Sequence, residues 1–252
     1  MESTRQLGVP LDLAGPVNFR DVGGYRTEDG LVVRRGRLYR SDGLWALSEA
    51  DLAHLMDEIG VRTIVDLRTP MEIERYGPGL LANSGVTMHN ISFFDESLRP
   101  DIPSEGSWTL DDMYVFLLRR AGERITSVLT ILSSADVQPA VFHCTAGKDR
   151  TGIVAGLLLG LLGVSDDDIA DDYASTAEYM PLFTERAAGF LEELGREAPA
   201  FSSHVLTADR EIMLRFLTVI RDDAGSLEEW VLSNGMAPAA LKSLRTNLLE
   251  RP

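Results

Sequence analysis

Residues 139–164, PAVFHCTAGKDRTGIVAGLLLGLLGV, constrain the fold more than any other part of the chain. A short apolar run, PAVFHC, leads into small and charged residues and then into the apolar run Gly152–Val164. That second run is well short of the ~20 residues that a membrane span needs. Because its apolar residues leave no polar side at helical spacing, we expect a helix buried all round, with other elements packed on every side. The stretch predicts a strand, a tight loop and a central helix in a layered structure.

Other apolar runs favour an α/β fold with a mainly parallel sheet flanked by helices. Strands are expected at 36–41, 61–68 and 139–144, each near a helical pattern. Ser48 is a predicted N-cap, with Asp51 three residues on. An amphipathic stretch runs from about Leu110 to Ser134, and after Ser165 nearly everything has a helical pattern, at 166–173, 177–194, 207–222, 226–233 and 237–250. With 252 residues, 44% of them hydrophobic, the chain can bury a full core, and we expect one domain with a helical C-terminal half.

Charge and composition exclude several classes of function. A formal net charge of −15 argues against nucleic acid or an anionic membrane as the main partner. The single cysteine excludes an internal disulfide and a CxxC-type zinc site, and no histidine has ligand spacing to it. A nucleotide-binding phosphate loop fails as well, because Phe142 stands where its first glycine belongs. We therefore expect no metal and no cofactor. The N-terminus lacks a secretory signal pattern, which favours a cytoplasmic location.

The only cysteine, Cys144, lies at the end of the expected strand. Binding sites in open α/β sheets lie at the carboxyl ends of the strands. Thr145, Ala146 and Gly147 are small, so their backbone N–H groups can turn inward around one centre, at the positive end of the following helix dipole. Such a loop binds a tetrahedral oxyanion and favours the thiolate form of the cysteine. The alternative for Cys144 alone is a buried structural thiol.

Arg150 follows Cys144 by six residues, where the helix begins. Its planar guanidinium can hold two phosphate oxygens at once. A phosphate held there has its phosphorus in line with the sulfur, so displacement would give a phosphocysteine that water later releases. Thr151 is placed to hydrogen-bond the thiolate, and His143 to hold the loop from behind. These spacings favour the catalytic interpretation of Cys144 over the structural one.

The pattern His-Cys-x5-Arg-Thr resembles the signature HC-x5-R-[ST] of the cysteine-dependent protein tyrosine phosphatases. The closer resemblance is to bacterial members, including those of mycobacteria. It extends to NFRDVGGY (18–25), GRLYRSDGL (36–44), DLRTPMEIERYGPG (66–79) and AGSLEEWVLSNGM (224–236), so it spans nearly the whole chain. It implies a single tyrosine-phosphatase-like domain over residues 1–252, with a parallel sheet flanked by helices. It further implies a helical lid over the site, which we expect at about 180–204.

Lys148 and Asp149 depart from a plain tyrosine phosphatase loop. Relatives with GKDR take the general acid from the aspartate inside the loop, which implies this role for Asp149, with Asp95 as the alternative acid. Lys148 and Arg150 should lower the pKa of Asp149, whereas a bound phosphate dianion should raise it. A structural ion pair with either cation is the other interpretation of Asp149. Lys148 is one of only two lysines in the chain. Phosphoinositide phosphatases resemble this loop in having a lysine there, which can meet a further phosphate on the rim of the site.

Two more candidates, Asp66 and Arg68, end a strand expected beside the cysteine strand. Asp66 can brace Lys148 or the loop. Arg68 is either a partner of Glu72 in the following turn or a substrate contact. Arg20, Asp21, Gly23 and Gly24 are assigned to a turn and left out of the site. The role of Arg40 is left open. The aromatic residues of the C-terminal half are assigned to helix cores: Tyr173, Tyr179, Phe183 and Phe190.

Together these features predict a phosphomonoester hydrolase that acts through a phosphocysteine, first of all a protein tyrosine phosphatase. A phosphoinositide or dual-specificity phosphatase is the alternative, and a non-catalytic phosphate-binding module is the rival of another class. Expected partners are phosphate and a phosphorylated protein or phosphoinositide; the oligomeric state is not indicated. The catalytic candidates are Cys144, Asp149 and Arg150, within a phosphate cradle made by Thr145, Ala146, Gly147, Lys148, Asp149 and Arg150.

Overall fold

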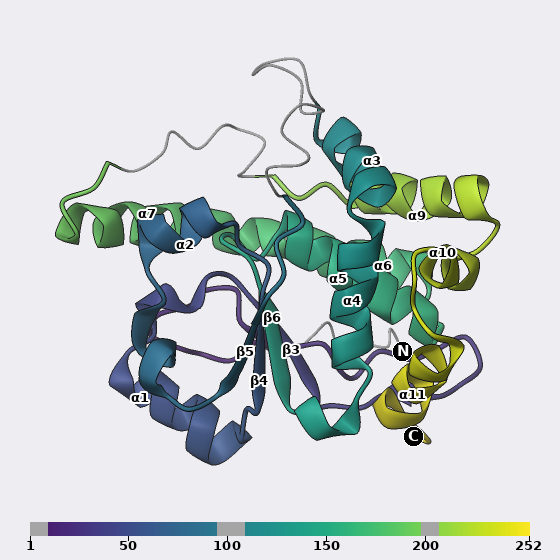
Figure 1. The fold of residues 1–252 in the computed structure, drawn as a ribbon, viewed down its shortest axis with the longest axis horizontal. Helices are drawn as coiled ribbons and strands as arrows, with labels where there is room; N and C mark the ends of the chain where they lie inside the picture. Colours follow the sequence, from purple (N-terminus) through teal and green to yellow (C-terminus); the bar gives the residue numbers. More distant parts are fainter. Residues whose placement is uncertain (1–9, 95–108, 198–206) are drawn as a thin grey trace, which may run out of the picture.

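A five-stranded sheet forms the centre of the molecule in a computed structural model that describes residues 10–94, 109–197 and 207–252 (Figure 1). Its strand order is β1-β3-β6-β4-β5, and all neighbours are parallel except β1 and β3. The strands are β1 (Arg20–Asp21), β3 (Leu38–Ser41), β4 (Thr63–Asp66), β5 (Thr87–Asn90) and β6 (Ala140–His143). A separate antiparallel pair joins β2 (Val32–Val33) to β7 (Leu249–Glu250). The predicted mixed α/β class with a mainly parallel sheet is confirmed.

Both faces of the sheet are buried. Leu38, Val65 and Phe142 belong to the large core on one face, whereas their chain neighbours Tyr39, Ile64 and Val141 belong to a second core on the other face. Successive side chains of a strand point to opposite faces, so a strand covered on both sides needs apolar residues at every position. This is why the central strands β4 and β6 lie in largely apolar runs of the sequence, whereas the edge strand β5, TMHN, is mostly exposed.

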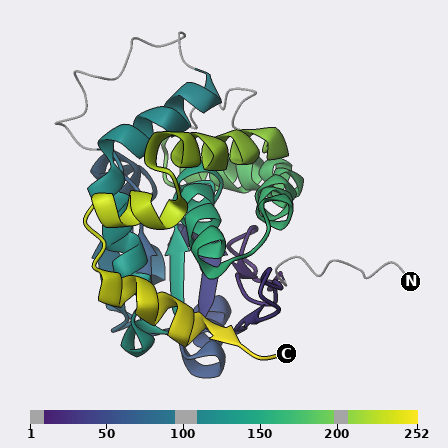
Figure 2. The same ribbon diagram turned by 90° about the vertical axis from the view of Figure 1, so that its right-hand side faces the viewer.

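Helices cover the two faces unequally. The described helices are α1 (Glu49–Ala53), α2 (Pro70–Tyr76), α3 (Leu110–Arg120), α4 (Gly122–Leu132), α5 (Asp149–Leu162), α6 (Asp166–Ser175), α7 (Met180–Glu193), α9 (Arg210–Ala224), α10 (Leu227–Ser233) and α11 (Pro238–Leu248), with a π-helical turn at His54–Ile59 after α1. Most of them surround α5 in the large core, and Figure 2 shows α9, α10 and α11 together on that side.

The central helix α5 is buried all round, as its sequence predicts: Thr151 through Leu159 are all buried. It contacts β3 and β6 on one side and α4, α6, α9, α10 and α11 on the others. None of the described helices is long and apolar enough to cross a membrane.

Helix boundaries agree with the sequence in part. The capping box predicted at Ser48 and Asp51 is present, with each side chain bonded to the other residue's backbone N–H. The stretch 110–134 is two helices rather than one, because the chain breaks at Ala121 and Asn234 lies where a side chain on Gly122 would stand. The last helix ends at Leu248, two residues early, because the chain there turns into the strand β7.

Three parallel strands end side by side and so create the site. Ser41 of β3 and Asp66 of β4 are both in register with His143 of β6. The segments that follow these strands therefore emerge at one edge of the sheet, with the loop after β6 in the middle.

Candidate active site

The loop from Cys144 to Lys148 connects β6 to the N-terminus of α5. Cys144 is only 2% exposed. Asp149 is the first residue of α5, so the loop lies at the positive end of that helix dipole. In the described part of the chain, the backbone N–H groups of Thr145, Ala146 and Gly147 donate to no protein acceptor. Free amides at a helix N-terminus form a cradle for an anion.

Gly147 gives the loop its sharp turn. Its φ is +66°, a left-handed conformation that favours glycine, and a Cβ there would lie 2.6 Å from the backbone nitrogen of Asp42. The Gly147 carbonyl accepts hydrogen bonds from Arg40 Nη2 at 3.0 Å and from Asn18 Nδ2 at 3.3 Å. A second tie runs from the Gly43 N–H to the Thr145 carbonyl at 2.9 Å. Two carbonyls of the loop are thus held by Arg40 of β3, by Gly43 just after β3 and by Asn18 before β1.

Arg150 is fixed by Glu72 of α2. Its Nη1 and Nη2 lie 2.7 and 2.6 Å from the two carboxylate oxygens, and Nη1 also donates to the Leu67 carbonyl at 3.1 Å. The hydroxyl of Thr145 donates to the same carboxylate. Burial raises the pKa of Glu72, but its bonds to Arg150 outweigh this and lower it to about 2. Burial disfavours the charged guanidinium of Arg150, yet the charges of Cys144 and Glu72 raise its pKa. Both partners are therefore charged at neutral pH.

Of the two interpretations of Arg68 from the sequence, the pairing with Glu72 is wrong, because Glu72 binds Arg150; contact with substrate stays a prediction. Arg68 instead donates to Asp66, with Nη2 at 2.7 Å and Nε at 3.0 Å from the carboxylate. Burial raises the pKa of Asp66, but the bonds from Arg68 help to lower it below its ordinary value. Both side chains are buried, and the guanidinium of Arg68 lies over the ring of Trp45. Arg68 therefore supports the residues behind the site.

His143 and Thr151 lie against the base of the loop. His143 Nδ1 is 3.1 Å from the Cys144 carbonyl, and its Nε2 is 3.8 Å from Asp66. Burial lowers the pKa of His143, so the ring is neutral at pH 7. Thr151 is buried, and its hydroxyl has no hydrogen-bond partner among the described residues.

Asp149 lies at the mouth of the loop with its side chain 26% exposed. Its Oδ1 is 3.5 Å from Lys148 Nζ and 3.3 Å from the hydroxyl of Tyr114. Burial raises the pKa of Asp149 above its ordinary value, although Lys148 and Arg150 oppose the rise. The sequence indicated the effect of the two cations but not the larger effect of burial.

Lys148 is buried, not exposed on the rim. Its side chain is 1% exposed, and Nζ donates to the Thr207 carbonyl at 2.9 Å. Thr207 precedes α9, so the lysine links the loop to the C-terminal helices. Binding of a further phosphate by Lys148 stays a prediction.

A buried charge network behind the loop was not predicted. Asp172 of α6 accepts from Arg20 Nε at 3.2 Å and also pairs with Arg40, the residue that holds the Gly147 carbonyl. All three are almost fully buried. Burial raises the pKa of Asp172, but the two arginines lower it to about 2. The sequence left the role of Arg40 open and assigned Arg20 to a turn, whereas Arg20 lies in the strand β1. No local signal pointed to Asp172 as their partner.

The helix α7 packs beside the loop. Phe183 and Met180 of α7 form a small core with Trp45 and Tyr76, and Ala146 of the loop packs against it. Figure 1 shows α7 next to α2. The lid expected at 180–204 begins with α7, and residues 198–204 lie outside the described residues, as does Asp95. The lid role stays a prediction.

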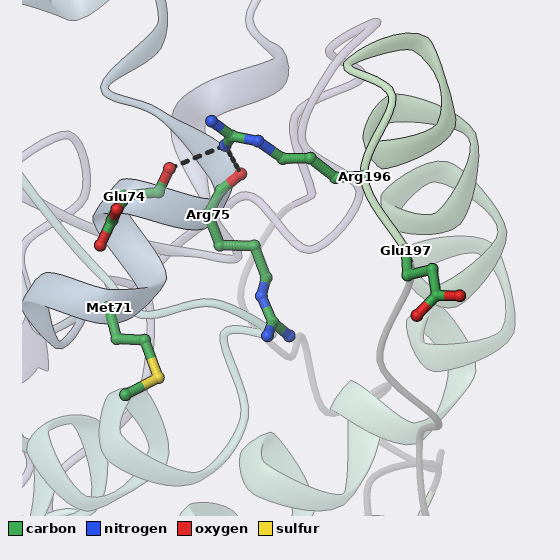
Figure 3. Close-up of a pocket in the computed structure, with 5 residues that line it drawn as sticks. All are labelled: Met71, Glu74, Arg75, Arg196 and Glu197. Carbon is green, nitrogen blue, oxygen red and sulfur yellow. Dashed lines mark hydrogen bonds between the residues drawn. The ribbon is translucent and has the colours of Figure 1, made fainter.

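A surface groove separates α2 from the end of the α7 segment (Figure 3). It has a volume of about 430 Å³ and is lined by Met71, Glu74, Arg75, Arg196 and Glu197. Arg196 donates to the carbonyls of Glu74, at 2.7 Å, and Arg75. These carbonyls belong to the last turn of α2, where backbone acceptors lack helical partners, so Arg196 both caps α2 and ties α7 to it.

No cluster of three or more His, Cys, Asp or Glu residues that could hold a metal ion occurs among the described residues.

Two curated relatives align with nearly the whole chain. The triple specificity protein phosphatase PtpB of Mycobacterium tuberculosis is 28% identical, over 94% of this chain and 98% of the relative. A putative tyrosine-protein phosphatase of Cupriavidus necator is 31% identical, over 85% of this chain and 80% of the relative.

Solved structures give weaker matches. The catalytic domain of the PP-IP phosphatase SIW14 from S. cerevisiae matches with a TM-score of 0.43 and 17% identity, over 87% of this chain and 98% of its own. P. aeruginosa TpbA in complex with pTyr matches with a TM-score of 0.45 and 16% identity, over 94% of this chain and 99% of its own.

The profile of the tyrosine phosphatase family matches residues 11–250. This match covers the strand, loop and helix around Cys144 together with the segments that brace them. The chain belongs to the tyrosine phosphatase family.

Proposed function

We propose that this protein hydrolyses phosphomonoesters through a phosphocysteine on Cys144, with phosphotyrosine in proteins as its main substrate. The observation that carries the proposal is the arrangement of Cys144 and Arg150 around free amides at the N-terminus of α5, with Arg150 held by Glu72. Family membership and the two relatives named as phosphatases support it.

In the first step the thiolate of Cys144 attacks the phosphorus of the bound ester. The S–P bond forms as the P–O bond to the leaving group breaks, and the protonated carboxyl of Asp149 gives its proton to the leaving oxygen. Arg150 and the loop amides stabilise the charge on the three equatorial oxygens. The hydroxyl of Thr151, which is buried without a described partner, donates to the sulfur.

In the second step water attacks the phosphocysteine. The Asp149 carboxylate takes a proton from the water as its oxygen bonds to phosphorus, and the S–P bond breaks to restore the thiolate and release phosphate. The raised pKa of Asp149 supports this double role, because the group must be protonated at the start and able to accept a proton later. No step uses a metal ion, so we expect full activity in the presence of a chelator.

The substrate range is wider under the alternative proposal, in which phosphoinositides or phosphoserine and phosphothreonine are also hydrolysed. The printed triple specificity of the mycobacterial relative supports it. The burial of Lys148 counts against a ready-made site for a second phosphate. A single catalytic domain over residues 1–252 and a cytoplasmic location are further parts of the proposal.

The first experiment compares kcat/KM for a phosphotyrosine peptide and a short-chain phosphoinositide, with Cys144→Ser as the blank. We expect the peptide to be preferred and the blank to be inactive while still binding inorganic phosphate. Comparable turnover of the lipid would favour the phosphoinositide alternative. Turnover by Cys144→Ser near that of the wild type would exclude the mechanism, and phosphate binding without turnover by the wild type would favour the non-catalytic module.

A further inference from the structure

Two buried tyrosines lead from the helical half of the molecule to Asp149. Tyr114 of α3 and Tyr173 of α6 are each 1% exposed. Their hydroxyl oxygens are 3.0 Å apart, and the Tyr114 hydroxyl is 3.3 Å from Asp149 Oδ1. Neither helix belongs to the loop motif, and the sequence assigns Tyr173 to a helix core. The two phenols therefore form a chain from α6 through α3 to the mouth of the site.

Packing holds this pair rigidly. The two rings meet edge to face, with centroids 6.2 Å apart, and Tyr114 also packs edge to face on Phe216 of α9 at 5.6 Å. Gly152, in the first turn of α5, allows the close approach of Tyr173, because a Cβ there would lie 2.9 Å from its ring. A larger residue at position 152 would push the pair away from Asp149.

Both phenols are neutral hydrogen donors. Burial raises the pKa of Tyr114 and of Tyr173, and the charge of Asp149 adds to each rise. Each hydroxyl has one proton. When Asp149 is ionised, the Tyr114 hydroxyl donates a hydrogen bond to the carboxylate, and the Tyr173 hydroxyl donates a hydrogen bond to the Tyr114 oxygen. When Asp149 is protonated, rotation of the hydroxyls relaxes the arrangement without any proton transfer.

The contacts distinguish the two oxygens of Asp149. Within the described residues, Tyr114 and Lys148 both contact Oδ1, which leaves Oδ2 to carry a proton to a leaving group. A donor to one oxygen stabilises the carboxylate that forms as the other oxygen loses its proton.

We propose that Tyr114, supported by Tyr173, is a positioning residue for the general acid: it fixes Oδ1 of Asp149 and stabilises the carboxylate that forms as the leaving group is protonated. This inference rests on the acid role proposed for Asp149. The charged groups that face this carboxylate or the tyrosine pair are Lys148, Arg150, Arg40 and Asp209.

The test measures kcat/KM for aryl phosphates ranging from nitrophenyl phosphate, whose leaving group needs little acid assistance, to phenyl phosphate, whose leaving group needs more. Tyr114→Phe keeps the ring and removes only the hydroxyl. We expect a loss of about 10-fold on phenyl phosphate and a clearly smaller loss on nitrophenyl phosphate. We also expect the basic limb of the kcat/KM profile to move to higher pH, because the ionised acid loses a donor.

Three variants complete the design. Tyr39→Phe removes a buried hydroxyl in β3, where Tyr39 contacts the second core and not Asp149, and should leave the dependence on leaving group unchanged. Tyr173→Phe should change it in the same direction as Tyr114→Phe but less. Adding Tyr114→Phe to Asp149→Ala should cause no further loss on phenyl phosphate.

The outcomes separate the inference from the proposed function. The positioning role of Tyr114 is wrong, and the acid role of Asp149 is kept, under either of two results. In the first, Asp149→Ala steepens the dependence of kcat/KM on the leaving group but Tyr114→Phe does not. In the second, the losses of the two substitutions add in the double variant. If Asp149→Ala itself leaves the dependence of kcat/KM on the leaving group unchanged, the acid is another group. Both the acid role of Asp149 and the positioning role of Tyr114 are then wrong. Inorganic phosphate binding and thermal unfolding of each variant show that the loop and the fold are intact.

Discussion

The single carboxylate of Glu72 has two roles, one in its own helix and one in the loop. As the N3 residue of α2 it accepts the Thr69 N–H at 2.8 Å and completes a capping box, and the same group binds Arg150 and Thr145 of the loop. The first turn of α2 therefore fixes the position of the phosphate-binding arginine. The sequence shows the capping pattern, but the partner 78 residues away comes from the fold.

Glu72→Gln should separate these two roles. Glutamine also serves at N3 of a capping box, so α2 should remain folded. The charge-assisted bonds to Arg150 are lost, and we expect kcat/KM for a phosphotyrosine peptide to fall about 10- to 100-fold. The matched control is Glu74→Gln, on the exposed side of the same helix. Steady-state kinetics with both variants test this, and equal losses would show that α2, not the bond to Arg150, had been disturbed.

Gly147→Ala should remove activity while the fold is kept. The substitution adds strain at φ +66° and places a Cβ 2.6 Å from the Asp42 nitrogen, which has no room to yield between β3 and the loop. Gly60→Ala is the control, because Gly60 has φ +71° but nothing within 4 Å. We expect both variants to lose about 1 kcal/mol of stability or more from the strained backbone, but only Gly147→Ala to lose phosphate binding. Binding of inorganic phosphate by calorimetry and unfolding in urea separate the two effects.

At the scale of elements, α6 braces the site through consecutive residues. Asp172 pairs with Arg40, which holds the Gly147 carbonyl, and Tyr173 bonds to Tyr114, which contacts Asp149. One turn of a helix outside the loop motif thus supports the end of the loop that leads into α5. The helix α6 also packs on α5, where Tyr173 approaches Gly152 in the first turn.

Asp172→Asn should destabilise the protein strongly. Arg20 and Arg40 are each no more than 2% exposed, and removing their common counter-charge leaves both cations buried without compensation. We expect a loss of about 3–5 kcal/mol in the free energy of unfolding. Asp167→Asn is the control on the same helix, since Asp167 pairs with Arg210 at the surface. Urea unfolding of the two variants measures the difference; similar small losses would mean that the buried network contributes little.

The sequence predicted what depends on neighbouring residues. The strand at Ala140–His143, the loop and the buried helix α5 follow from one apolar pattern interrupted by small residues, and the capping box at Ser48 follows from its own spacing. It did not predict which charges meet, because Glu72, Asp172 and Tyr114 reach the loop from three different helices. Nor did it predict the burial of Lys148, which depends on how the segment before α9 crosses the loop.

Across the whole molecule, buried carboxylates respond to pH in opposite directions. The pKa values of Glu72 and Asp172 are lowered to about 2, so their contributions to stability are complete above about pH 4.5 and are lost as the pH falls toward 2. Burial raises the pKa of Asp42 to about 6, although the N–H groups of Val17 and Asn18 oppose the rise. Its contribution is complete below its ordinary pKa of 3.8 and is lost as the pH rises through about 6.

The free energy of unfolding should therefore peak near pH 4–5 and decline as the pH rises to about 6, above which Asp42 adds no further loss. The formal net charge of −15 at pH 7 acts in the same direction, because self-repulsion grows as carboxyls ionise. Asp42 follows the carboxyl end of β3 and lies against Gly147, so its ionisation places an extra charge beside the turn of the loop.

Asp42→Asn tests this whole-molecule balance. Asparagine keeps an oxygen to accept the Val17 and Asn18 N–H groups but cannot ionise. We expect the variant to be the more stable protein at pH 8, by up to about 3 kcal/mol, and to lose most of the decline between about pH 4 and 6. Asp57→Asn, at an exposed position after α1, removes the same formal charge and should change the profile little. Urea midpoints from pH 3 to 8 give the comparison. If the wild type and Asp42→Asn decline in parallel between about pH 4 and 6, the loss of stability comes from net charge and not from the carboxyl beside the loop.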